Sequence, residues 1–312
     1  TDFLLPRFGK FVAAHIRKSH ADVLVGWSSA ILEAIPVAQY KGIAVAVDRG
    51  AAHIRHQNEV LEAAYHSQGL RFPGISRAVI DRELAEYEAA DRILVLSSLA
   101  AETFIENGVP AEKIAVVPLG VDSNRFRIRS HPERPGKPSI LFVGTVGIQK
   151  GMPQLLRAFA PLSGDAELRL VGPVEPAFAD LLTCLPTKGV TLPGAARKRH
   201  VAHAYAGADI FCLPSVQEGF GMVVLEAMAS GLPVVVSDQV GAADLVSHGE
   251  TGFVYPVQDD VALTEYLGML AGDAALRRKM GFAARQAAES RENSWEAYVD
   301  RVVSALGALT PA

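Results

Sequence analysis

Residues 207–237 contain the feature that most limits how this chain can fold: two short apolar runs separated by a glycine-containing loop and one helical segment. The runs lie at 210–213 and 234–236, and uninterrupted apolar runs of this length are typical of strands buried in a parallel sheet. Between them, apolar residues recur at helical spacing from about 220 to 230, where a Gly-Leu-Pro sequence ends the helix. The stretch predicts a strand–loop–helix–strand unit, and such units bind ligands at the carboxyl ends of their strands.

Two carboxylates lie in this unit, Glu218 in the loop and Glu226 one to two turns inside the helix. The spacing lets both side chains point toward a ligand that lies across the helix N-terminus, where free N–H groups and the helix dipole favour an anion. The loop glycines let a ligand approach the backbone closely. A ligand with hydroxyls and phosphates would suit this arrangement. Taken alone, however, two glutamates at this spacing are better explained as solvated loop and helix residues.

The full run EGFGMVVLEAMASGLPVV, which starts at Glu218, resembles the E-x7-E signature of the retaining GT-B glycosyltransferases, and most closely glycosyltransferase family 4. The resemblance implies an α/β fold with two Rossmann-like domains that face each other across a cleft. It implies that Glu218 contacts hydroxyls of the donor sugar and that Glu226 contacts the ribose of its nucleotide. It also implies donor contacts from the turn between them, at Gly219, Phe220, Gly221, Met222 and Val223.

A second glycine-containing loop, GTVGIQKG at 144–151, follows a predicted strand at 140–143 and precedes a helix. Glycines between a strand and a helix N-terminus suit a phosphate, and Lys150 adds a cation, although the loop is not a P-loop because no Ser or Thr follows the lysine. Lys150 matches a lysine of the resembled family, and Thr145 stands where that family often has an arginine. We expect Gly144, Thr145 and Lys150 to bind the donor, with one phosphate contact missing or supplied elsewhere; surface solvation of Lys150 is the alternative.

An amphipathic helix is predicted near 29–41 and a buried strand at 43–47. A polar loop follows that strand, in the position where active-site residues accumulate in open α/β sheets. The resemblance makes His53 of this loop a candidate catalytic residue beside the donor sugar, together with Glu218 and Lys150. An equally good alternative is that His53 caps or pads the helix that follows. For Asp48 and Arg49, at the start of the loop, an internal ion pair is an equally good interpretation.

The length of 312 residues favours two domains, and the Pro- and charge-rich stretch 130–138 predicts the linker between them. We expect an N-terminal, acceptor-side Rossmann-like domain at 1–133 and a C-terminal domain that binds the nucleotide-sugar donor at 134–293. By resemblance, a last helix at about 294–312 returns to the N-terminal domain, with an aromatic pair, Trp295 and Tyr298, as its anchors. The chain opens on a predicted helix instead of the usual strand and glycine-rich turn, so we also expect the N-terminal domain to be truncated.

The reaction that the resemblance implies is transfer of a sugar from a nucleotide diphosphate to an acceptor hydroxyl, with retention at the anomeric carbon. The expected co-substrate is a nucleotide-diphosphate sugar, with no cofactor and no metal if Lys150 and the helix N-terminus neutralise the leaving diphosphate. The acceptor stays open among a glycan, a lipid and a small molecule. One alternative is a nucleotide-sugar-binding module without transfer activity, because N-terminal strands are missing. A less favoured one is a NAD-dependent dehydrogenase, which would need a cleaner glycine fingerprint.

Charge and cysteine content limit the partners and the compartment. The formal net charge of −4 gives no attraction to nucleic acid, and the histidine pairs lack the Glu or Cys partners that a metal site needs. Two cysteines in apolar surroundings indicate a reducing compartment, so we expect a cytoplasmic protein. A basic cluster at 197–200 leaves open a peripheral contact with the inner membrane face, although a solvated helix start is the preferred interpretation.

Overall fold

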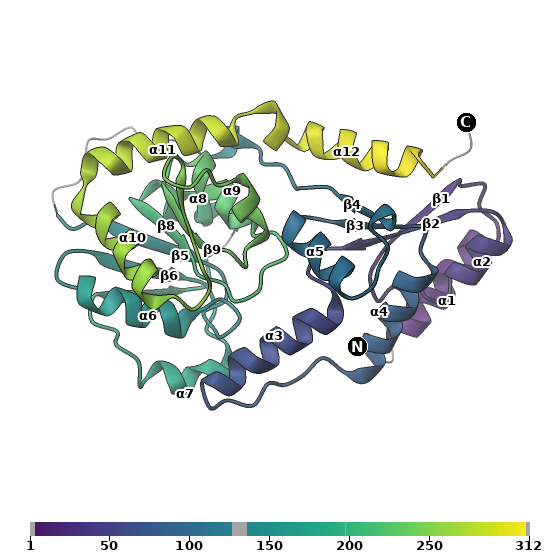
Figure 1. The fold of residues 1–312 in the computed structure, drawn as a ribbon, viewed down its shortest axis with the longest axis horizontal. Helices are drawn as coiled ribbons and strands as arrows, with labels where there is room; N and C mark the ends of the chain where they lie inside the picture. The colour runs from purple at the N-terminus through teal and green to yellow at the C-terminus, as the bar shows by residue number, and fades with distance from the viewer. Residues whose placement is uncertain (1–3, 127–135, 197, 310–312) are drawn as a thin grey trace.

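The computed structural model describes residues 4–126, 136–196 and 198–309, with the side chains of 198–200 excepted. Within these residues the chain forms two parallel β-sheets, each covered by helices, in the two-domain α/β arrangement that the sequence predicted (Figure 1). The predicted domain boundary after residue 133 and most of the predicted linker at 130–138 lie outside the described residues.

The N-terminal sheet has four parallel strands in the order β1-β2-β3-β4. Apolar runs form its buried middle, as expected for strands covered on both faces. Its strands are β1 (Val23–Trp27), β2 (Ala44–Arg49), β3 (Arg92–Val95) and β4 (Ile114–Val116). Its helices are α1 (Leu4–Ile16), α2 (Ile35–Tyr40), α3 (Ile54–Ser67), α4 (Arg77–Ala89) and α5 (Ser98–Glu106).

The helix predicted at 29–41 is wrong over its first part, because α2 begins only at Ile35. The preceding turn is held by a buried carboxylate from α4, Glu86, which accepts the backbone N–H groups of Ser29, Ile31 and Leu32. An ion pair also joins Arg82 of α4 to Glu33 of the same turn. These contacts satisfy the N–H groups without a helix, so the residues before Ile35 adopt turns.

The C-terminal sheet has six parallel strands in the order β10-β9-β8-β5-β6-β7. From the central strand β5 the chain first builds β6 and β7 on one side and then β8, β9 and β10 on the other. Its strands are β5 (Ser139–Val143), β6 (Glu167–Val171), β7 (Val190–Gly194), β8 (Ile210–Leu213), β9 (Val234–Ser237) and β10 (Gly252–Tyr255). Its helices are α6 (Met152–Phe159), α7 (Ala179–Leu182), α8 (Lys198–Ala206), α9 (Met222–Ala229), α10 (Asp260–Gly272) and α11 (Ala274–Ala288).

The predicted strand–loop–helix–strand unit is confirmed as β8–α9–β9, with every residue of both strands buried. Gly231, which follows α9, has φ +77°, a left-handed conformation that glycine adopts without strain and that ends the helix. The order of the strands reverses between β5 and β8. Ligands in open α/β sheets bind where the strand order reverses, and the loops after these two strands carry Lys150 and Glu218.

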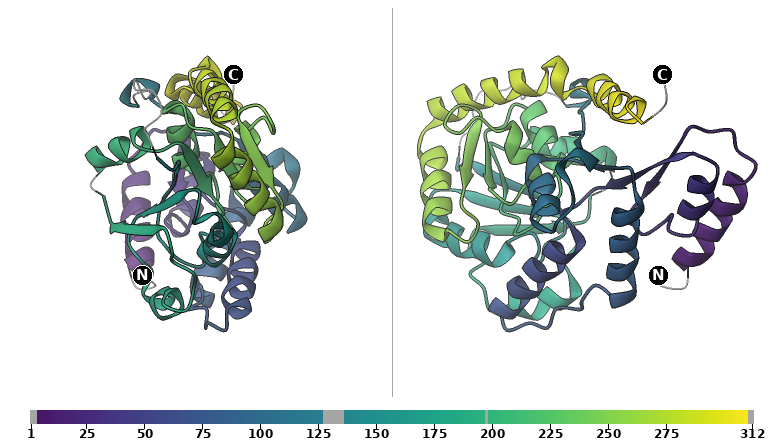
Figure 2. Two further views of the ribbon diagram at one scale, coloured as in Figure 1. Left: turned by 90° about the vertical axis from the view of Figure 1, so that its left-hand side faces the viewer. Right: turned by 45° about the vertical axis from the view of Figure 1, so that its right-hand side comes forward.

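The last described helix, α12 (Trp295–Gly307), extends from the end of α11 along the N-terminal domain (Figures 1 and 2). The N–H of Val121 donates to the carbonyl of Asn293 (2.8 Å), and the Arg301 guanidinium donates to the carbonyl of Pro118 (2.9 Å). Tyr298 is partly buried and meets the ring of Trp295 edge-on at 5.6 Å, while Trp295 itself remains 40% exposed. The crossing therefore rests on backbone and arginine contacts, and the anchoring role of Trp295 and Tyr298 stays a prediction.

Candidate active site

The loops after β5 and β8 meet through an ion pair between Lys150 Nζ and the Glu218 carboxylate. Their backbones are also joined, because the Val216 N–H donates to the carbonyl of Gln149 (2.9 Å). Gly151 fits between the loops in a left-handed conformation (φ +67°), and a Cβ there would lie 1.9 Å from the carbonyl oxygen of Pro214. The structure thus brings together the glycine-containing loop and the glutamate loop, which the sequence identified separately.

Glu218 lies over the N-terminus of α9. A Cβ added at Gly221, the residue that precedes the helix, would lie 3.2 Å from Glu218 Cγ. Met222 and Val223 form the first turn of α9 and are partly exposed, whereas Phe220 and Gly221 are buried. The first N–H groups of a helix have no partner inside it and carry the positive end of its dipole. This end of α9 can therefore attract an anion close to Lys150.

Glu226 lies one turn inside α9, as predicted, and accepts a hydrogen bond of 2.9 Å from the hydroxyl of Tyr205 on α8. Tyr205 is fully buried, and burial followed by the nearby Glu226 carboxylate raises the pKa of its hydroxyl well above the usual value. The phenol therefore stays protonated and acts as a donor to Glu226. The sequence analysis did not identify Tyr205, and no local pattern in its segment marks it.

Gly144 and Thr145 begin the loop that carries Lys150. Gly144 has φ +151°, and its carbonyl lies so close to Gly172 that a Cβ at Gly172 would be 1.7 Å away. Thr145 is exposed, whereas the next residue, Val146, is buried. Both predicted residues thus share a loop with Lys150, and their contacts with a donor remain predictions.

His53 lies immediately before α3 and is 1% exposed. Its ring packs edge-on against Phe104 at 5.1 Å and at a tilt against Tyr87 at 5.3 Å, and its backbone N–H donates to Thr103 Oγ1. Burial, helped by Arg55, Arg49 and His56, lowers the pKa of the His53 imidazole to about 4, so the ring is neutral at pH 7. His53 holds the N-cap position of α3 without a side-chain hydrogen bond to that helix, and its ring packs on α4 and α5 instead. Its catalytic role stays a prediction.

The Asp48–Arg49 ion pair considered in the sequence analysis is replaced by a different one. Arg49 pairs with Glu83 of α4 at 3.3 Å and donates to Gln57 Oε1 at 2.7 Å. Adjacent residues on a strand point to opposite faces of the sheet, so Asp48 and Arg49 are poorly placed to meet. The sequence analysis did not identify Glu83, which is buried.

The loop with Glu218 is also a contact between the two domains. Gly219 packs on the backbone of the N-terminal domain, and a Cβ there would lie 2.0 Å from the carbonyl oxygen of Gly50. The hydroxyl of Ser97, which caps α5, donates to the carbonyl of Gly219 at 3.0 Å. The Gln57 amide lies 3.5 Å from Gln217 Oε1, next to Glu218. The predicted donor turn is therefore held between the domains.

Asp244 makes a further contact across the interface. Its carboxylate accepts the backbone N–H of Ser98 at 2.8 Å and the Ser98 hydroxyl at 2.7 Å. Because Ser98 is the first residue of α5, this carboxylate lies at the positive end of a helix dipole.

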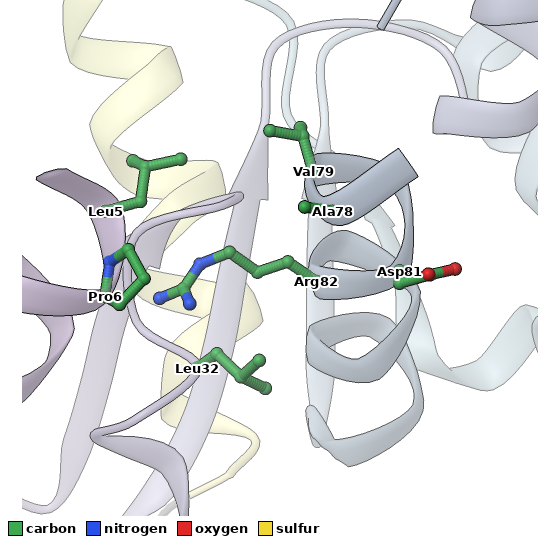
Figure 3. Close-up of a pocket in the computed structure, with 7 residues that line it drawn as sticks. All are labelled: Leu5, Pro6, Leu32, Ala78, Val79, Asp81 and Arg82. Atoms are coloured by element: carbon green, nitrogen blue, oxygen red, sulfur yellow. The ribbon is translucent and has the colours of Figure 1, made fainter. Parts of the chain in front are cut away.

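A separate cavity of about 290 Å³ lies between α1 and α4 in the N-terminal domain, lined by Leu5, Pro6, Leu32, Ala78, Val79, Asp81 and Arg82 (Figure 3). The figure shows Arg82 extending across the cavity toward Pro6, while Asp81 points away. The Arg82 guanidinium is already paired with Glu33 and donates to the carbonyl of Ser29. The cavity contains none of the predicted site residues.

No cluster of three or more His, Cys, Asp or Glu side chains in the part of the chain that the structure describes could hold a metal ion. No helix formed by the described residues combines the length and the apolar character that crossing a bilayer requires.

Two family models match the chain. One, described as glycosyl transferases group 1, matches residues 123–287, and the other, described as glycosyltransferase family 4, matches residues 3–125. Both are glycosyltransferase models and they cover the two halves of the chain in turn. Neither match favours the dehydrogenase alternative.

Curated proteins with similar sequences are also glycosyltransferases. A sulfoquinovosyl transferase of Arabidopsis thaliana is 31% identical over 231 residues, covering 69% of this chain and 44% of that protein. A D-inositol 3-phosphate glycosyltransferase of Nocardia farcinica is 28% identical over 274 residues, covering 78% of this chain and 58% of that protein. The chain thus spans about half the length of the curated relatives it matches.

Solved structures with the same fold cover nearly the whole chain. Sucrose-phosphate synthase from Thermosynechococcus elongatus superposes with a TM-score of 0.78 at 23% identity, over 99% of this chain and 78% of that one. Anabaena HepE in complex with UDP superposes with a TM-score of 0.77 at 18% identity, over 96% of this chain and 82% of that one. These similarities establish the GT-B arrangement of two Rossmann-like domains.

Proposed function

The chain belongs to the glycosyl transferases group 1 family, and from this membership we propose that it is a retaining glycosyltransferase that moves a sugar from a nucleotide-diphosphate donor to an acceptor hydroxyl. The observation that carries the proposal is the pairing of Lys150 with Glu218 over the N-terminus of α9, where the strand order of the sheet reverses. One cation, one helix N-terminus and one carboxylate meet there. The cation and the helix N-terminus suit the negative charge of a diphosphate, and the carboxylate can accept hydrogen bonds from the hydroxyls of a sugar.

Each group at this point has a part in donor binding. Lys150 and the first N–H groups of α9 would bind the diphosphate, helped by the backbone of Gly144 and Thr145. Glu218 would accept hydroxyls of the sugar, exchanging its contact with Lys150 for contacts with the donor. Glu226, oriented by the hydroxyl of Tyr205, would accept the ribose hydroxyls.

In the reaction the bond from the anomeric carbon to the phosphate oxygen breaks and a bond to the acceptor oxygen forms. Negative charge develops on the leaving diphosphate, and Lys150 with the α9 N-terminus would stabilise it, which makes a metal ion unnecessary in this proposal. The leaving phosphate would take the acceptor proton, so no protein nucleophile is assigned. Glu218 is then a positioning residue for the sugar and not a general base.

The proposal extends to partners and location. Structures of HepE with UDP and with UDP-glucose support a nucleotide-sugar donor, and the acceptor is a glycan, a lipid or a small molecule. The two cysteines, Cys184 and Cys212, are free thiols, which supports a cytoplasmic location. Peripheral contact with the inner membrane face is supported by α1, where Phe8 and Phe11 are more than half exposed beside Lys10. The side chains of the basic cluster at 197–200 lie outside the described residues.

The experiment that tests the proposal measures thermal unfolding with UDP, GDP and their sugars, and then sugar transfer and donor hydrolysis with whichever donor stabilises the chain. We expect one nucleotide sugar to raise the melting temperature and Glu218→Ala to abolish transfer. Glu250→Ala, which removes an exposed carboxylate elsewhere in the same domain, is the matched control. Stabilisation without transfer would favour the binding-module alternative. Transfer that is undiminished in Glu218→Ala would contradict the assigned role.

A further inference from the structure

Helix α3 is shared by the hydrophobic cores of both domains. Ile54, in its first turn, packs in the core cluster of the N-terminal sheet. Leu61, Ala64 and Tyr65, in its second half, belong to the larger core cluster, which contains the C-terminal sheet and also Leu94 and Leu96 of the N-terminal domain. Figure 1 shows the helix running from the N-terminal sheet to the region of α7. A displacement of one domain relative to the other must therefore move or unpack α3.

The last turn of α3 makes a polar contact with the C-terminal domain. The hydroxyl of Tyr65 donates to Glu175 Oε1, and the Tyr65 side chain is buried with its ring 5.2 Å from that of Phe72. Burial and the Glu175 carboxylate raise the pKa of the Tyr65 phenol, so it remains a proton donor at neutral pH.

The other oxygen of the same carboxylate holds the loop that carries Lys150. Glu175 Oε2 accepts the backbone N–H of Ile148 at 3.1 Å, two residues before Lys150. The Glu175 backbone N–H donates to the carbonyl of Val146 at 2.9 Å. Contact is so close at Gly147 that a Cβ there would lie 2.1 Å from Glu175 Oε2. The carboxylate thus fixes the path of the loop between Val146 and Lys150.

We propose that Glu175 is a positioning residue for the Lys150 loop and that its bond to Tyr65 makes the geometry of this loop depend on the contact between the two domains. One carboxylate joins a helix anchored in the N-terminal core to the backbone that aims Lys150. Loss of the carboxylate would leave the loop free to move Lys150 away from a diphosphate. Loss of the Tyr65 hydroxyl alone would remove the link to the N-terminal domain but keep the bond to Ile148. The inference rests on the proposed function only for the role of Lys150.

The test uses the full chain and three variants, Glu175→Ala, Glu175→Gln and Tyr65→Phe. Glu167→Ala removes an exposed carboxylate from the same domain, and Tyr40→Phe removes the hydroxyl of a tyrosine that is 93% exposed, so they are the matched controls. Amide hydrogen exchange of residues 144–151 is measured without nucleotide, and the Kd for UDP and for GDP is measured separately. Failure to bind either nucleotide would count against the proposed function. Hydrogen exchange would still test the role of Glu175, because it is measured without nucleotide.

We expect Glu175→Ala to speed amide hydrogen exchange at 144–151, because a hydrogen bond to a charged acceptor is lost. The Kd of whichever nucleotide binds more tightly should rise about tenfold. Tyr65→Phe should speed exchange in the same segment by a smaller factor. Glu175→Gln keeps an acceptor oxygen for Ile148 and should restore slow exchange and affinity. The inference is overturned if exchange at 144–151 is the same in Glu175→Ala as in Glu167→Ala, or if the glutamine variant behaves like the alanine variant.

Discussion

The hydroxyl of Tyr205 donates to Glu226 across 2.9 Å, and this bond joins α8 to the second of the two glutamates in the active-site helix. Because Tyr205 is fully buried and remains protonated, it holds one oxygen of Glu226 in a fixed direction. The affinity for the ribose of a nucleotide should therefore depend on a residue that does not touch the nucleotide.

Tyr205→Phe keeps the buried ring and removes only the hydroxyl. We expect it to weaken nucleotide binding about threefold to tenfold and to lower the free energy of unfolding by about 1 kcal/mol, the net value of one buried hydrogen bond. Calorimetric titration with UDP or GDP and urea unfolding measure the two effects. Tyr266→Phe, on the partly buried ring that stacks on Phe253, is the control. Equal nucleotide affinity in both variants would show that Glu226 needs no support from α8.

Lys150→Ala should lower kcat about a hundredfold, the usual effect of removing one group that stabilises developing charge. The reason is that the leaving diphosphate would lose the cation that pairs with Glu218 in the structure. Steady-state transfer kinetics measure the effect. Lys188→Ala, on an exposed loop of the same domain, should leave kcat unchanged. A fall in kcat below threefold for Lys150→Ala would remove Lys150 from the mechanism.

His53 should make stability fall in acid. Its pKa is lowered to about 4 in the folded chain against the ordinary 6.5, so the unfolded chain binds the proton more readily. The contribution of the neutral ring is fully present above pH 6.5 and is lost as the pH falls from 6.5 toward 4, by up to about 3 kcal/mol. Urea unfolding at pH 7.5, 6 and 4.5 should show a smaller loss for His53→Asn than for the wild type. A variant with the same pH dependence as the wild type would mean that the His53 ring takes up protons freely in the folded chain.

Gly219→Ala tests the contact between the domains. A methyl group there would lie 2.0 Å from the carbonyl oxygen of Gly50, so the backbones must separate. We expect kcat/KM for transfer to fall more than tenfold and the radius of gyration from X-ray scattering to rise. Gly164→Ala is the matched control, because nothing lies within 4 Å of a Cβ at that position. An unchanged radius of gyration together with unchanged activity would show that the domains work without this contact.

The sequence predicted the parts of the fold that depend on neighbouring residues. The β8–α9–β9 unit follows from apolar runs and from a glycine after the helix, and both signals act within a few residues. The loop of Lys150 and the loop of Glu218 could be identified for the same reason. Their meeting in one ion pair depends on the order of strands β5 and β8, which the residues of the two loops do not encode.

What the sequence missed depends on contacts between distant residues. The turn before α2 was predicted as helix because its composition suits one, yet Glu86 binds its N–H groups from 54 to 57 positions away. Tyr205 and Glu175 likewise act through partners that only the fold brings near. His53 was identified by its place after a strand, but the burial that sets its pKa comes from Tyr87 and Phe104.

Helix α3 contributes side chains to both core clusters, so separating the two halves of the chain would divide a shared core. If the two halves were produced as separate polypeptides, the C-terminal half would lack Leu61, Ala64 and Tyr65 and would present bare apolar surface to water. The N-terminal half would carry those same side chains without their partners from the C-terminal domain. Neither piece should then be soluble by itself, and co-expression should be needed to recover both.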